Sequence, residues 1–193
     1  LFDHSNNSTV NQCEKQYPQL INFMNIYIRK NPQVINKICD MHFFNIIENA
    51  LLSKEEYKIS NEIVCIMIDI CSTIISFDLP FFFFPLNLIS SILSFIQIGQ
   101  NNEILKSSMF FVFFLLNYLN QIRDQNYYHV VNNLLFFKNT LFNLLEIEKV
   151  IWSHLLQSNN YQNQNIDEAE TLLYAAYSAL SSFFLTKEND IAA

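Results

Sequence analysis

Cysteine and histidine are the residues of this chain best suited to hold a metal ion or to act as nucleophiles. The sequence has four of each, and no two cysteines form a Cys-x-x-Cys pair. Structural zinc sites take their ligands from closely spaced pairs. We therefore expect no metal site, no cofactor, and the reduced thiols of a cytoplasmic or nuclear protein. The residues are Cys13, Cys39, Cys65, Cys71, His4, His42, His129 and His154.

Carboxylates and hydroxyls form no recognisable catalytic motif. Glu55 and Glu56 are adjacent, but they lie in a charged break between apolar segments. The chain has neither the Gly-x-Ser-x-Gly turn of hydrolases nor the His-Glu-x-x-His motif of zinc proteases. Its single glycine, Gly99, excludes a glycine-rich phosphate loop and a dinucleotide fingerprint. These features predict a protein that is not an enzyme.

The charge balance of the chain is acidic. Eleven Lys and Arg residues stand against eighteen Asp and Glu residues, which gives a net charge of −7. Nucleic-acid binders need a basic face that neutralises phosphates, so we expect no direct nucleic-acid partner. The negative charge keeps an apolar chain in solution, and it also suits a basic protein partner.

The composition predicts helices. The 193 residues are 51% apolar, which is ample for a core, and they include nineteen Phe and nine Tyr but one Gly. Tight hairpins depend on residues such as Gly that adopt positive φ, so we do not expect a many-stranded fold. The length fits one domain or part of a larger one.

Apolar residues recur with helical spacing from Tyr17 onward, and polar breaks divide this pattern into segments. Residues 1–16 and 187–193 are polar and are expected to be tails, and Ser158–Asn165 is expected to be a loop. The pattern predicts helices over 17–30, 33–40, 42–52, 61–77, 86–98, 101–120, 127–137, 139–157 and 167–185.

The long helices begin in a similar way each time. They open at Asn61-Glu62, Asn102-Glu103 and Asp167-Glu168. Asn and Asp are good N-caps, and a following Glu interacts favourably with the positive end of the helix. The three glutamates are 41 and then 65 residues apart. The first interval is a usual length for a helical repeat, and the longer helix 139–157 and its loop account for the second.

Residues 31–53 resemble the first two helices of an armadillo repeat, with Met41-His42 at the turn where the family usually has Gly. The segments from Asn61, Asn102 and Asp167 resemble third helices. This resemblance to the armadillo and HEAT repeat family covers residues 17–186. It implies an all-α, right-handed α-solenoid of about three repeats, part of a longer one, since stacked repeats share one core.

Third helices in the importin-α-like branch of this family carry Trp-x-x-x-Asn, in which Trp stacks on a cationic side chain and Asn binds the peptide backbone. Aligned residues here keep one of the six family residues. The resemblance thus implies a non-catalytic scaffold or adaptor that binds other proteins, with an adaptor for Lys/Arg-rich peptides in nuclear transport as the alternative. The aligned pairs are Ile68 and Ser72, Phe113 and Asn117, and Ser178 and Ser182.

Two uncharged stretches, 79–102 and 107–122, leave a helical membrane-complex subunit as a further alternative. Pro80 and Pro85 interrupt the first stretch, and the second contains Asn117 and Asn120. We therefore do not expect the chain to insert into a membrane.

Three further residues have an expected place in the packing. We expect Trp152, the single tryptophan, to lie in the core. Tyr174 and Tyr177 lie beside Ala175, Ala176 and Ala179. This small-residue face is expected to pack against a neighbouring repeat.

Overall fold

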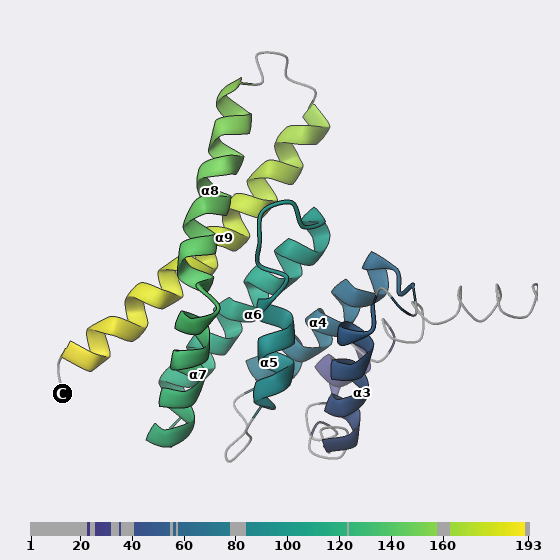
Figure 1. The fold of residues 1–193 in the computed structure, drawn as a ribbon, viewed down its shortest axis with the longest axis vertical. Coiled ribbons are helices and arrows are strands. Elements are labelled where there is room, and N and C mark those ends of the chain that lie inside the picture. Colours follow the sequence, from purple (N-terminus) through teal and green to yellow (C-terminus); the bar gives the residue numbers. More distant parts are fainter. Residues whose placement is uncertain are drawn as a thin grey trace, which may run out of the picture.

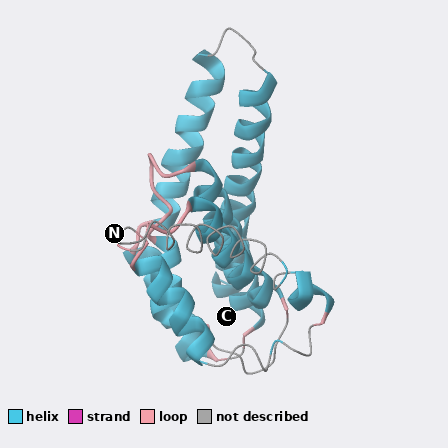
Figure 2. Cartoon of the chain, turned by 90° about the vertical axis from the view of Figure 1, so that its right-hand side faces the viewer, coloured by secondary structure: helices cyan, strands magenta, loops and turns pink. Residues whose placement is uncertain are grey.

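The structure is a computed structural model that describes residues 41–54, 56, 58–77, 84–122, 124–157 and 163–191, together with 23, 26–31 and 35. Within these residues all regular structure is helical, as Figure 2 shows. The helices are α3 (Met41–Leu52), α4 (Asn61–Ser76), α5 (Leu86–Leu93), α6 (Asn102–Gln121), α7 (Gln125–Phe137), α8 (Thr140–Gln157) and α9 (Asn163–Ile191).

The expectation of an all-α protein is thus confirmed. Two helices end several residues away from their expected last residues. Helix α5 ends at Leu93 rather than near Ile98. Directly after this end the Ser94 hydroxyl donates to the Ser91 carbonyl at 2.6 Å. Helix α9 continues to Ile191 rather than ending near Leu185, because the segment contains no Gly or Pro that would stop it.

The N-caps lie one residue before the expected ones. The Ser60 side chain accepts from the Ile63 amide at the start of α4, and the Asn101 side chain accepts from the amides of Glu103 and Ile104 at the start of α6. Glu62 and Glu103 therefore fall in the first helical turn, where a carboxylate favours the helix dipole. Helix α9 begins before Asp167, which is not a cap.

Two rows of helices make up the fold. Helix α6 lies between α4 and α9 and packs extensively against both (Figure 1). A second row has α5 between α3 and α7, and α5 also contacts α6. Helix α8 packs against α7 and α9. This order of contacts makes α6 the central helix of the molecule.

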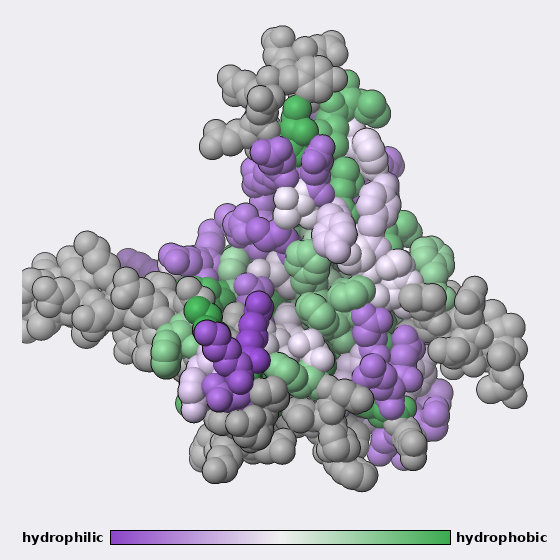
Figure 3. Space-filling view, turned by 180° about the vertical axis from the view of Figure 1, so that it is seen from behind, coloured by the Kyte–Doolittle hydropathy of each residue, from purple (hydrophilic) through white to green (hydrophobic). Residues whose placement is uncertain are grey.

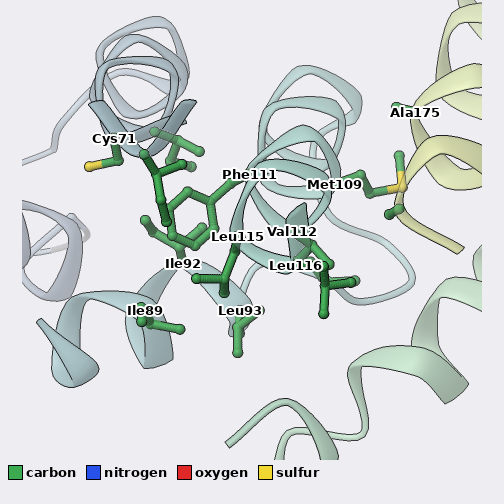
Figure 4. Packing of buried hydrophobic residues seen from close by; sticks show 14 of the residues in the cluster. Cys71, Ile89, Ile92, Leu93, Met109, Phe111, Val112, Leu115, Leu116 and Ala175 are labelled. Carbon is green, nitrogen blue, oxygen red and sulfur yellow. The ribbon is translucent and has the colours of Figure 1, made fainter. Parts of the chain in front are cut away.

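Large aromatic side chains join the two rows near α6. Phe44 of α3 and Phe84, just before α5, have ring centroids 4.9 Å apart, and Phe84 and Phe111 of α6 are 5.6 Å apart. All three are buried. Figure 4 shows Phe111 between the α4 and α6 ribbons, close to Ile92 of α5.

Small residues let α9 approach α6 closely. Ala175, Ala176 and Ala179 are fully buried, and Met109 reaches from α6 toward Ala175 (Figure 4). Because α9 packs extensively against α6, this small-residue face meets another helix of the chain, and that the two helices belong to neighbouring repeats stays a prediction.

One side chain of α7 and one of α8 donate hydrogen bonds to backbone carbonyls in the middle of the chain. The Tyr127 hydroxyl of α7 donates to the Phe84 carbonyl at 2.8 Å. The Asn143 amide of α8 donates to the Ile96 carbonyl, also at 2.8 Å. Burial raises the pKa of the Tyr127 hydroxyl, so it remains a donor across the neutral range.

Some expectations lie outside the described residues. They include the tail 1–16, most of the helices expected over 17–40, Cys13 and Cys39. Among the described helices none is long and apolar enough to span a membrane.

Candidate functional site

The predicted site residues belong to the row α4–α6–α9, and we call the exposed side of this row the three-helix face. On α6 this face consists of partly or fully exposed residues at helical spacing, and apart from the partly exposed Phe114 the positions between them are buried. Residues three or four apart lie on the same side of a helix. The α6 residues of the three-helix face are Glu103, Lys106, Phe110, Phe113 and Asn117.

Contacts between α6 and α9 fix the register of this face. The Asn102 amide donates to the Glu168 carboxylate at 2.8 Å, and the rings of Phe110 and Tyr174 are 6.0 Å apart. Both contacts join residues about 65 positions apart, in the same order along the two helices, so α6 and α9 run parallel. Phe113 therefore lies level with Ser178, as the sequence alignment has it.

Phe113, Asn117 and Ser178 are partly exposed, but Ser182 is buried. The Ser178 hydroxyl donates to the Tyr174 carbonyl at 2.8 Å, and the Ser182 hydroxyl donates to the Ser178 carbonyl at 3.1 Å. Both hydroxyls thus have partners within α9. The exposed large side chain of α9 beside Phe110 is Tyr174.

Ile68 and Ser72 of α4 lie in the core. Ile68 is fully buried, and the buried Ser72 hydroxyl donates to the Ile68 carbonyl at 3.0 Å. Buried side chains do not reach a bound peptide, so this part of the alignment does not describe a binding surface.

The register between α4 and α6 explains this discrepancy. Ser107 bonds to Asp69, which places residues about 40 apart side by side. By that offset of about 40 residues, Thr73 and Phe77 are the α4 positions level with Phe113 and Asn117. The interval of 41 residues between Glu62 and Glu103 is close to this offset, and it was the sequence signal that could have indicated which part of α4 is level with Phe113 and Asn117.

A polar cluster lies between α4 and α6, beside the three-helix face. The Ser107 hydroxyl hydrogen-bonds to the Asp69 carboxylate and to the Cys65 thiol. Burial raises the pKa of Asp69, while Ser107 and the positive charges of Arg29 and Lys106 oppose that rise. Lys106 also pairs with Glu103, and Arg29 donates to the Thr73 hydroxyl at 3.4 Å.

Cys65 is a weak nucleophile in this cluster. Burial, reinforced by the Asp69 charge, raises the pKa of its thiol from 9.0 to about 11. Since the thiolate is the reactive form, the group is protonated at neutral pH. Cys65 and Cys71 are both free thiols, and Cys71 is buried. Across the described residues no three His, Cys, Asp or Glu side chains gather as metal ligands would.

Alkylation kinetics will check the state of Cys65. At pH 8 we expect iodoacetamide to modify Cys65 about 100-fold more slowly in the folded protein than in the urea-unfolded chain, because its thiolate fraction falls with the rise in pKa. The folded rate should still be rising at pH 10. Peptide mass spectrometry of quenched samples measures both rates, and equal rates at pH 8 would contradict the assignment.

A second group of exposed aromatic residues lies between α8 and α9. The Trp152 indole N–H donates to the Tyr177 hydroxyl at 2.8 Å, and that hydroxyl donates to the Glu148 carboxylate at 2.8 Å. Trp152 is 42% exposed, so the expectation that it lies in the core is wrong. Trp152 belongs to a series of residues on α8 that are spaced alternately three and four positions apart. This spacing was the sequence signal that the prediction of a core position missed.

Comparison of the chain with models of known families, with curated proteins and with solved structures gives no match. What the chain can do is therefore inferred from its own side chains. The three-helix face offers aromatic rings and an amide, and the Cys65 thiol next to it is protonated at neutral pH.

Proposed function

We propose that this chain is a non-catalytic helical-repeat module that binds other proteins, as a scaffold or adaptor in a larger complex. In this proposal α3 with α4, α5 with α6, and α7 and α8 with α9 form three stacked units of a right-handed armadillo or HEAT-type α-solenoid. The two rows of helices support it, since α4, α6 and α9 pack in succession and α3, α5 and α7 do the same.

The three-helix face is the proposed binding surface. The observation that carries this choice is the pair Phe113 and Asn117, one turn apart on the exposed side of the central helix, with Tyr174 of α9 beside Phe110. An amide side chain in this position can bond to the backbone of an extended peptide. Aromatic faces attract the cationic groups of Lys and Arg.

A peptide titration tests this surface. We expect a fluorescein-labelled Lys/Arg-rich peptide to bind the intact protein, and Phe113→Ala or Asn117→Ala to weaken binding about 5- to 30-fold, the effect of losing about 1–2 kcal/mol of contact energy. Binding should weaken further as salt concentration rises. Fluorescence anisotropy gives the Kd values.

The matched control is Asn133→Ala on the exposed side of α7, outside the three-helix face. We expect it to leave the Kd unchanged. Equal weakening by Asn133→Ala and Asn117→Ala would remove the three-helix face as the binding surface. Absence of binding to any basic peptide would reject the alternative of a nuclear-transport adaptor and leave the proposal of a scaffold.

A further inference from the structure

An exposed apolar stripe runs along α8. Its members are separated alternately by three and four residues, and Lys149 occupies the middle position. Leu156 is 76% exposed and Trp152 is 42% exposed. This alternation is the spacing with which one helix packs along another. The stripe consists of Phe142, Leu145, Lys149, Trp152 and Leu156.

Helix α9 widens this stripe. Tyr177 and Phe184 are exposed, and Tyr177 is held beside α8 by its bonds to Trp152 and Glu148. The two hydrogen bonds fix the orientation of both aromatic rings and satisfy their polar atoms. Aromatic residues that are ordered before binding lose little conformational entropy on association. We call this surface, the α8 stripe with Tyr177 and Phe184, the α8–α9 seam.

Carboxylates flank the α8–α9 seam. Asp167 and Glu170 lie near the start of α9, and Glu146 and Glu148 lie beside the stripe on α8, against the single Lys149. Figure 3 shows hydrophobic residues along the α8 edge of this hairpin and hydrophilic residues along the α9 edge. The seam is therefore an apolar strip with an acidic border.

We propose that the α8–α9 seam binds an amphipathic helix of a partner protein, with its apolar side on the stripe and basic residues at its borders. The alternating spacing matches a helix, and the acidic border matches basic flanks. A second copy of this chain fits less well, because it would bring the same carboxylates against this border. This surface is separate from the three-helix face and goes beyond the proposed function.

Trp152 provides the measurement, since it is the single tryptophan of the chain. The probe is an 18-residue Leu/Lys peptide without tryptophan whose leucines follow the three-and-four spacing. We expect it to bind the intact protein with a blue shift of Trp152 emission. A Leu/Glu peptide of the same pattern should bind at least about tenfold more weakly, as should a Leu/Lys peptide with a scrambled order.

Variants distinguish the surfaces. Leu156→Lys should weaken binding of the Leu/Lys helix by about tenfold or more, and Leu156 is exposed enough for the fold to tolerate the change. The matched control, Ile46→Lys, alters an exposed residue of α3 and should leave the Kd within about twofold. The blue shift of Trp152 emission reports binding at the seam itself, so this test is independent of the three-helix face.

Three results would overturn the proposal. One is equal binding of the Leu/Lys, Leu/Glu and scrambled peptides. Another is equal weakening by Leu156→Lys and Ile46→Lys. The third is a dimer in sedimentation equilibrium that Leu156→Lys dissociates, which would make a second copy the occupant of the seam.

Discussion

Phe111→Ala is expected to lower the free energy of unfolding by about 3–5 kcal/mol, the usual cost of removing a large buried aromatic side chain. Phe111 is fully buried, and its ring contacts Phe84, which in turn contacts Phe44. The substitution leaves a cavity between α4, α5 and α6, where the two rows of helices meet. Urea denaturation followed by circular dichroism measures the change.

Phe142→Ala is the matched control for this experiment. It makes the same chemical change at a position that is 63% exposed, so we expect a loss within about 0.5 kcal/mol. If both substitutions had the same effect, Phe111 would not occupy the centre of the fold, and the packing of the two rows through α6 would be wrong.

Ala175→Asp is expected to destabilise the protein by at least about 3 kcal/mol at pH 7, because it places a charge without a partner in an apolar interface. Ala175 is fully buried where α9 meets α6. Burial raises the pKa of the new carboxyl above its unfolded value of about 3.9. The loss of stability should therefore diminish as the pH falls toward 4.

Ser181→Asp controls for charge on the same helix. Ser181 is exposed, and we expect its substitution to change the free energy of unfolding little at either pH. Urea titrations of both variants at pH 7 and pH 4 give the comparison. A loss for Ala175→Asp that is small or independent of pH would show that α9 does not pack on α6 through its small-residue face.

The helical class and most helix positions could be predicted from the sequence, because apolar spacing reports directly on which side of a helix is buried. The end of α5 could not, since no Gly or Pro marks it in the sequence. The predicted N-caps were one residue late, because the true caps, Ser60 and Asn101, are each followed by a residue that is an equally plausible cap.

The candidate site was only partly predictable. Phe113 and Asn117 lie on the exposed side of α6 as expected. The α4 pair could not be placed without the register between parallel helices, which depends on contacts such as that of Ser107 with Asp69. Trp152 is exposed because its indole N–H finds its partner, Tyr177, at the surface, and sequence spacing does not specify which side of α8 meets α9.

Site-specific photo-crosslinking in the protein's own cells tests the central claim most directly. Benzoylphenylalanine in place of Phe113 preserves an aromatic ring on the three-helix face, and the same group at the exposed position of Ile46 on α3 serves as control. The proposal predicts that the label at 113 joins a defined set of partner proteins that the label at 46 does not. Identical adducts from both positions, or none from 113, would contradict a protein-binding role for this face.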